Sequence, residues 1–208
     1  GALAGVSLAG DRFFYVNPLE SNGDHHRQAW YGCACCPSQI SRFLPSIGNY
    51  IYGTSDKALW VNLFIGNTTE VTIDGKKVVM KQETDYPWDG LVKLTVTSEQ
   101  PLGKELRIRI PGWCKSYTLS VNGNKVDSTT DKGYTVIKEW KTGDLIVLNM
   151  DMPVEKVSAD PRVRQNTGKR ALQHGPLVYC LEETDNAKDF ADLALTPTSS
   201  FEVKDEPD

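Results

Sequence analysis

"LVKLTVTSEQPLGKELRIRIP", residues 91–111, decides the fold class of this chain. Apolar and polar residues alternate through 91–98 and again through 104–111. Side chains two positions apart lie on the same face of a strand, so each segment predicts a strand with one buried and one exposed face. The segment between them contains Pro101 and Gly103, which favour a turn.

Segments of the same kind fill the chain from residue 58 to residue 150. Turn pairs such as Asp74-Gly75 and Asn122-Gly123 separate several of them. Short strands at this spacing predict a mainly β chain with an antiparallel, jelly-roll-like β-sandwich over 52–156. The other predicted strands are 58–65, 69–74, 76–84, 117–123, 134–140 and 144–150.

The segment before the sandwich has a different period. Apolar residues recur at helical spacing over 37–50, with Pro37 in the first turn, Pro45 as a kink and Gly48 as a stop. A short strand is predicted upstream, over 12–20. The apolar positions of the helix are Ile40, Phe43, Leu44 and Ile47.

The period changes divide the chain into three predicted regions. Residues 1–51 carry the cysteine cluster and the predicted helix, 52–156 form the sandwich, and 157–208 form the beginning of a second sandwich, because so few residues cannot complete one. In the last region, 171–183 predicts two strands bent at Gly175-Pro176.

Composition excludes some classes of protein. The 208 residues carry a net charge of −4, with acidic and basic residues interspersed, which argues against a nucleic-acid partner. No apolar run approaches the roughly 18 residues of a membrane span. The first residue is Gly1 rather than Met, which is consistent with a piece of a larger protein.

Three of the five cysteines, Cys33, Cys35 and Cys36, lie together at the start of the predicted helix. Thiolates bind zinc, and a helix start favours the thiolate form, which suits a metal ligand or a nucleophile. Buried thiols or a strained disulfide are the alternatives. Cys114 and Cys180 stand alone inside strand patterns and are predicted to be core residues.

Polar and aromatic residues precede the thiols within a few positions. His25, His26, Arg27 and Trp30 could border a sugar site, because such sites combine aromatic faces with polar groups. A solvated loop is the alternative for the two histidines. Glu20 could face the same pocket or lie on the surface.

Five segments closely resemble glycoside hydrolase family 127, and together they span roughly residues 1–186. The resemblance implies a retaining β-L-arabinofuranosidase with a catalytic (α/α)6 barrel followed by β-sandwiches. It also implies a zinc ion held by one glutamate and three cysteines, one of which is the nucleophile. The segments are "GALAGVSLAGDRFFYVNPLES", "HHRQAWYGCACCPSQISRFLPSIGNYIYG", "QETDYPWDG", "LRIRIPGWC" and "ALQHGPLVYCLEE".

By this resemblance Cys35 is the nucleophile and a zinc ligand, Cys36 is a second ligand, and Cys33 is not a ligand. The glutamate ligand, the third cysteine and the general acid/base have no counterpart in this chain. Residues 1–51 would then be the end of the barrel, which would be a partner domain, and the substrate would be an arabinofuranoside.

This chain alone is therefore expected to be inactive and to hold zinc weakly or not at all. Its unpartnered apolar helix face would pack onto the sandwich or drive self-association. The alternatives are a non-catalytic sandwich that binds carbohydrate or supports a barrel, and a structural zinc or redox module. The compartment stays open, because exposed thiols fit a cytoplasm and bound metal would protect them in a periplasm.

Overall fold

The computed structural model describes residues 5–17, 21, 23–33, 35–181, 186 and 193–204. It divides into two compact units, Gly1–Ile51 and Tyr52–Asp208. No helix among the described residues is long and apolar enough to cross a membrane.

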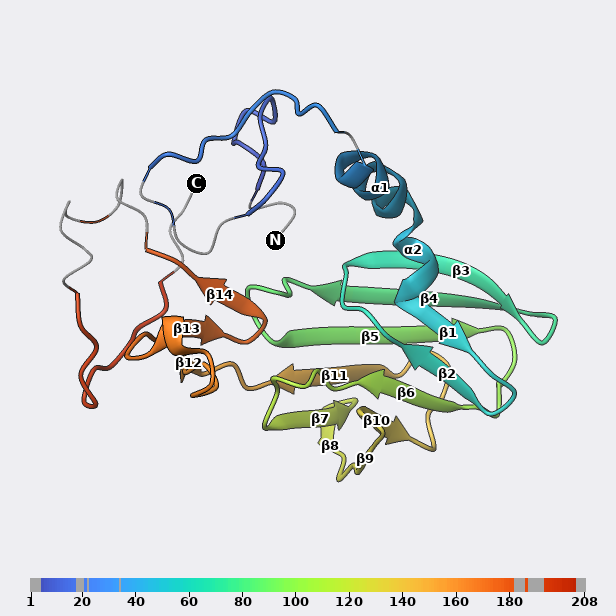
Figure 1. Ribbon diagram of the computed structural model, residues 1–208. Helices are drawn as coiled ribbons and strands as arrows, with labels where there is room; N and C mark the ends of the chain where they lie inside the picture. The colour runs from blue at the N-terminus through green and yellow to red at the C-terminus, as the bar shows by residue number, and fades with distance from the viewer. Residues whose placement is uncertain are drawn as a thin grey trace. The chain divides into compact units, whose positions relative to one another are not determined.

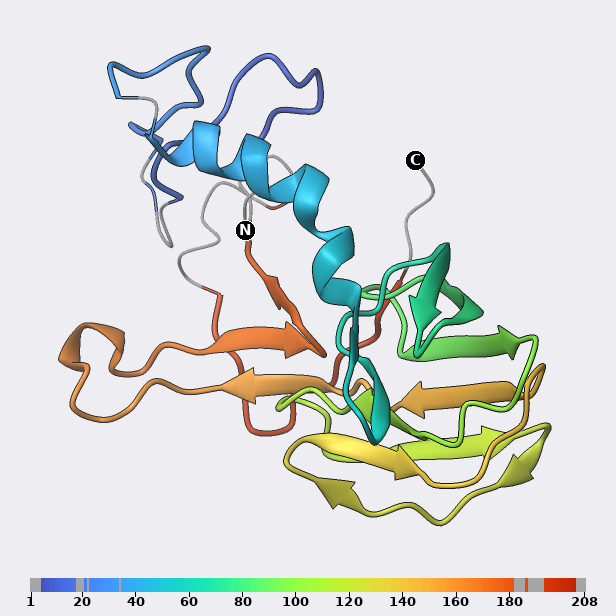
Figure 2. The same ribbon diagram turned by 90° about the vertical axis from the view of Figure 1, so that its right-hand side faces the viewer.

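The helical segment of the first unit is interrupted at Pro45. Helix α1 (Cys35–Phe43) is the longest helix described, and the 3-10 turn η1 (Leu44–Ser46) and the short helix α2 (Gly48–Ile51) follow it (Figure 2). Pro45 has no N–H to continue the α-helical hydrogen bonds, so the predicted kink is confirmed. The predicted stop at Gly48 is wrong, because α2 begins there.

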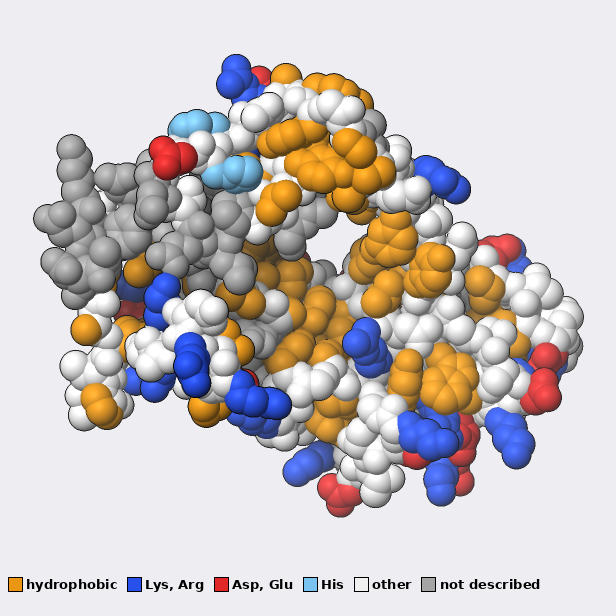
Figure 3. Space-filling view, viewed as in Figure 1, with side chains coloured by type: hydrophobic (Ala, Val, Ile, Leu, Met, Phe, Trp, Pro, Cys, Tyr) orange, Lys and Arg blue, Asp and Glu red, His pale blue; other side chains and the backbone are white. Residues whose placement is uncertain are grey.

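No side chain of α1 is buried. The apolar residues Ile40, Phe43 and Leu44 remain about 40–50% exposed. Figure 3 shows hydrophobic side chains gathered on the visible surface of this unit. The predicted apolar face therefore exists, and within the described residues it is not buried.

The predicted strand over 12–20 does not form in its described part, and residues 18–20, including Glu20, lie outside the described residues. Phe13 makes only single antiparallel bridges to Val6 and Gln28. The aromatic side chains here pack on one another instead of alternating across a sheet, which explains why the pattern was misleading.

The six-stranded sheet of the second unit is entirely antiparallel, in the order β3-β4-β5-β11-β7-β8 (Figure 1). The hairpin between β3 and β4 turns at Asp74-Gly75, where both residues have positive φ, as the sequence predicts. Asn122-Gly123 does the same between β7 and β8. The strands are β3 (Asn67–Ile73), β4 (Lys76–Thr84), β5 (Leu91–Ser98), β7 (Tyr117–Val121), β8 (Asn124–Lys125) and β11 (Leu145–Met150).

The five-stranded sheet has the order β1-β2-β6-β10-β9. One pair, β2 and β6, is parallel, with Leu59 opposite Leu106. This pair departs from the purely antiparallel prediction. The strands are β1 (Tyr52–Thr54), β2 (Ala58–Val61), β6 (Glu105–Arg109), β9 (Thr130–Asp131) and β10 (Tyr134–Ile137).

One hydrophobic core joins the two sheets, which confirms the predicted sandwich. Alternate residues of each strand point into it, such as Val92, Leu94 and Val96 on β5 and Leu106 and Ile108 on β6. All five are at most 2% exposed. Burial of this kind contributes roughly 1.5–3 kcal/mol for each large apolar side chain.

A three-stranded sheet completes the second unit, and its predicted bend at Gly175-Pro176 is confirmed. It contains β12 (Val154–Val157), β13 (Ala171–His174) and β14 (Leu177–Tyr179), with a 3-10 turn η2 (Arg164–Asn166) between the first two. Cys180 follows β14 and is exposed, so its prediction as a core residue is wrong. Cys114 is half-buried and contacts the sandwich core from the turn after β6.

Candidate active site

The three neighbouring thiols meet at the N-terminal end of α1. Cys35 and Cys36 are the first two residues of the helix, and all three thiols are free and exposed. The Cys35 Sγ lies 3.7 Å from the Cys33 Sγ and 3.8 Å from the Cys36 Sγ. None of the three is buried or paired in a disulfide, so both of these alternatives from the sequence are wrong for this cluster.

Tyr15 joins this cluster from a loop far away in the sequence. Its hydroxyl lies 2.7 Å from the Cys35 Sγ and 3.8 Å from the Cys33 Sγ. Hydrogen bonding to Cys35, and then to Cys36 and Cys33, raises the pKa of Tyr15 above its ordinary value. The tyrosine therefore keeps its proton and can donate it to a hydrogen bond with a thiolate.

Sequence reasoning missed Tyr15. Two segments, 5–17 and 23–33, hold the tyrosine at the thiols by pairing with each other. The backbones of Phe13 and Gln28 exchange two hydrogen bonds of 3.0 Å. The Tyr31 hydroxyl donates to the Phe13 carbonyl oxygen at 3.1 Å, and the Tyr31 ring lies 5.5 Å from the Tyr15 ring. No local pattern predicts such a pairing of loops.

The predicted sugar-site residues take up local contacts with the same loops. The His25 ring stacks on Phe14 at 5.0 Å, and the Arg27 guanidinium lies 4.5 Å from the centre of that Phe14 ring. His26 is exposed. Trp30 is 62% exposed and packs edge-on against Phe13. A role of these four residues in binding sugar stays a prediction.

Cys35 has the sulfur spacing of two zinc ligands with Cys36 and equally with Cys33, whose sulfur lies 3.7 Å away. A Zn–S bond of about 2.3 Å places two tetrahedral sulfur ligands about 3.8 Å apart. The Cys35 and Cys36 sulfurs are separated by 3.8 Å. Within the described ranges, no group of three or more His, Cys, Asp and Glu side chains is arranged to hold a metal.

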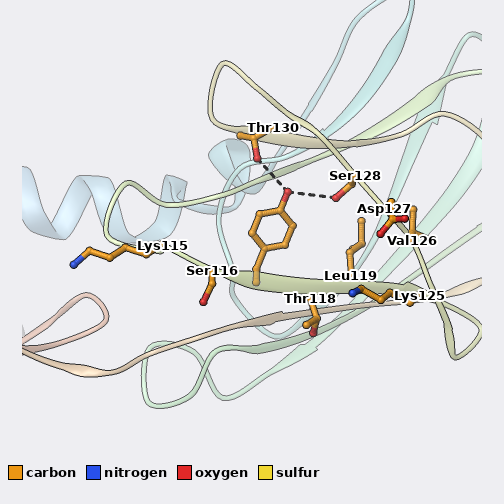
Figure 4. A pocket seen from close by; sticks show the side chains of 10 residues that line it. Lys115, Ser116, Thr118, Leu119, Lys125, Val126, Asp127, Ser128 and Thr130 are labelled. Atoms are coloured by element: carbon orange, nitrogen blue, oxygen red, sulfur yellow. Dashed lines mark hydrogen bonds between the residues drawn. The ribbon is translucent and has the colours of Figure 1, made fainter.

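A separate cavity of about 430 Å³ lies beside β7 and β8 of the sandwich (Figure 4). The Tyr117 hydroxyl is hydrogen-bonded there to the Ser128 and Thr130 hydroxyls, at 3.3 and 3.1 Å. Figure 4 shows Lys115 and Lys125 at opposite ends. No cysteine or histidine lines this cavity, so it shares nothing with the thiol site.

Three models of one family match consecutive parts of the chain. The β-L-arabinofuranosidase GH127 catalytic domain matches residues 1–49, the GH127 middle domain matches 58–152, and the glycoside hydrolase family 127 C-terminal domain matches 154–207. The thiol cluster thus falls within the catalytic-domain match, and the sandwich falls within the middle-domain match.

Individual relatives agree with these matches. A non-reducing end β-L-arabinofuranosidase of Bifidobacterium longum subsp. longum is 39% identical over 94% of this chain and 32% of its own length. A GH127 β-L-arabinofuranosidase of Geobacillus stearothermophilus T6 is 45% identical with a TM-score of 0.91, over 99% of this chain and 35% of its own. A further solved GH127 β-arabinofuranosidase is 40% identical with a TM-score of 0.83, over 89% of this chain and 32% of its own.

The chain spans about a third of the length of these relatives. Family models cover almost all of it in the order catalytic, middle and C-terminal, and the solved relatives share its fold at 40–45% identity. The chain belongs to glycoside hydrolase family 127.

Proposed function

We propose that this chain is the C-terminal part of a retaining, zinc-dependent glycosidase that acts on β-L-arabinofuranosides, with Cys35 as its nucleophile. The observation that carries the proposal is the position of the Cys35 sulfur. It lies at a helix start, among two further thiols and a tyrosine hydroxyl, inside the segment that matches the family's catalytic domain. The substrate class follows the printed names of the relatives.

Cys35 suits nucleophilic attack because its sulfur is exposed and beside a helix N-terminus. The helix dipole and free backbone N–H groups favour a thiolate there. The thiolate attacks the anomeric carbon, a C–S bond forms, and the glycosidic C–O bond breaks. The departing oxygen takes a proton from a general acid, which belongs to the upstream part of the enzyme.

The second step regenerates the thiolate. Water attacks the anomeric carbon of the thioglycosyl intermediate and loses a proton to the general base, and the C–S bond breaks. Two displacements at one carbon retain its configuration, as in glycosidases that use a carboxylate nucleophile. A thiolate is a good leaving group, so it can serve in both steps.

Tyr15 is a positioning residue for this sulfur. A donated O–H hydrogen bond stabilises the thiolate and limits its rotation. The Tyr15 hydroxyl is protonated at neutral pH, as an unperturbed tyrosine is, and its contact with Cys35 raises its pKa further. We expect Tyr15→Phe to slow turnover, since the Cys35 sulfur loses a hydrogen-bond donor.

Cys35 and Cys36 would hold the zinc ion, whose charge keeps both sulfurs deprotonated near neutral pH. The remaining ligands, a glutamate and a third cysteine, belong to the upstream barrel, of which residues 1–51 are the end. This chain alone would therefore be inactive and would bind zinc weakly.

Serine variants of the longer enzyme test these roles. Cys35→Ser should abolish hydrolysis of an aryl β-L-arabinofuranoside, because a neutral hydroxyl is a poor nucleophile and a poor zinc ligand. Cys36→Ser should lower both zinc content and rate, and Cys33→Ser, the matched control, should be much milder. An active Cys35→Ser enzyme would refute the assignment.

A further inference from the structure

The loop between β4 and β5 presents a tryptophan to solvent. Trp88 is 68% exposed, although its loop is well ordered by hydrogen bonds. The backbone N–H of Trp88 donates a hydrogen bond to the Asp85 backbone carbonyl oxygen at 2.9 Å. The backbone N–H of Leu91 donates to the Asp89 carboxylate at 2.9 Å. The Thr84 hydroxyl closes the loop by donating to the Leu91 carbonyl at 2.6 Å.

The loop is also anchored to the sandwich core by Tyr86. The Tyr86 ring packs edge-on against the buried Phe64 at 5.5 Å and stacks on Trp113 at 6.4 Å and 18°. Trp113 belongs to the turn after β6, so two turns distant in sequence meet here. The loop backbone next to Trp88 is therefore fixed to the sandwich core through Tyr86.

Two acidic side chains that could accept hydrogen bonds from sugar hydroxyls flank Trp88 in the sequence. Asp85 and Asp89, on either side of Trp88, are exposed. An indole face contacts the C–H face of a sugar, while carboxylates accept hydrogen bonds from its hydroxyls. A single exposed apolar residue is common on protein surfaces, but a large aromatic side chain held out by an ordered loop is suited to binding.

We infer that Trp88 is the stacking platform of a carbohydrate-binding site on the sandwich, separate in chemistry from the thiol cluster. The ligand class is a neutral oligosaccharide containing furanose or pyranose rings. The inference rests on the proposed function, because a glycosidase meets such chains as substrate. The site holds the oligosaccharide and takes no part in bond cleavage.

Titration of this chain with an L-arabinofuranose oligosaccharide, followed by NMR, tests the inference. Trp88→Ala should weaken binding at least ten-fold, whereas Trp88→Phe, which keeps a smaller aromatic face, should weaken it about three-fold. Tyr179→Ala is the matched control, because Tyr179 is an exposed aromatic residue on β14. It should leave the affinity unchanged.

Three results would overturn the inference: no binding by the wild-type chain, equal binding by Trp88→Ala, or equal losses in Trp88→Ala and Tyr179→Ala. The same titration with Cys35→Ser separates it from the proposed function. Binding that depends on Trp88 should survive Cys35→Ser. Failure of this binding, with hydrolysis by the longer enzyme still dependent on Cys35, would refute only the Trp88 site. Binding that depends on Trp88, together with hydrolysis that does not depend on Cys35, would refute only the assignment of the nucleophile.

Discussion

Gly90, at the end of the loop that carries Trp88, should tolerate no side chain. A Cβ at this position would lie 2.0 Å from the Met150 carbonyl oxygen and 2.9 Å from its carbonyl carbon. Reaching an ordinary contact of 3.4 Å requires the two backbones to separate by about 1.4 Å. That movement would break the 3.0 Å hydrogen bond from the Met150 N–H to the Gly90 carbonyl.

The cost of Gly90→Ala follows from these contacts. A lost backbone hydrogen bond costs about 1 kcal/mol, and an overpacked site costs about 1–3 kcal/mol. Reduced entropy of the unfolded chain offsets roughly 0.4–1 kcal/mol. We expect a net loss of about 1–3.6 kcal/mol, or a fall in Tm of roughly 2–14 °C for a domain of this size.

Thermal unfolding of the chain, followed by far-ultraviolet circular dichroism, measures this loss. Gly112→Ala is the matched control, because a Cβ there meets no atom within 4 Å and its φ is not positive. It should stabilise the chain by roughly 0.4–1 kcal/mol, because only the reduced entropy of the unfolded chain changes. Equal Tm values for Gly90→Ala and Gly112→Ala would refute the reasoning.

Three further predictions concern charge, thiols and metal. Hydrogen bonds from the Lys141 backbone N–H and the Asn122 side-chain amide lower the pKa of Asp144. The stability that the ionised Asp144 carboxylate contributes is therefore present above about pH 4 and is lost as the pH falls through the lowered pKa. Asp144→Asn should therefore destabilise the chain by less than about 1 kcal/mol at pH 7 and by a smaller amount at pH 2, and an equal loss at both pH values in urea titrations would contradict this. Cys180 should react with a thiol reagent faster than Cys114, because Cys114 is half-buried and burial raises its pKa. Mass spectrometry of labelled peptides measures the two rates. A faster reaction of Cys114 would contradict the fold. Purified chain should lose zinc on dialysis against a chelator, and one zinc ion retained per chain would mean that the ligand set has been misassigned.

The sandwich could be predicted because its strands alternate between two environments. The bounds predicted for 76–84 and 91–98 coincide with β4 and β5, where each second side chain is buried. Strands β1, β8 and β9 were not predicted, because two or three residues are too short to show a period. The parallel pairing of β2 with β6 depends on contacts distant in sequence, which alternation does not specify.

The site was predictable to a lesser extent. The spacing of Cys33, Cys35 and Cys36 indicated a reactive cluster, and the structure brings their sulfurs within 3.7–3.8 Å of Cys35. Tyr15 could not be found in this way, since its approach to Cys35 depends on the pairing of two irregular loops. A strand was predicted over the first of these loops, but its rings pack on residues of the second segment, Tyr31, His25 and Arg27.

A covalent bond between Cys35 and the sugar is the central claim, and peptide mass spectrometry tests it directly. The longer enzyme would be quenched with acid during turnover of an aryl β-L-arabinofuranoside, whose good leaving group lets the intermediate accumulate. Trypsin releases residues 28–42, which contain all three neighbouring cysteines, as one peptide. The account predicts one added pentosyl group, located on Cys35 by fragmentation. A pentosyl group on Cys33, on Cys36 or on a carboxylate would contradict it.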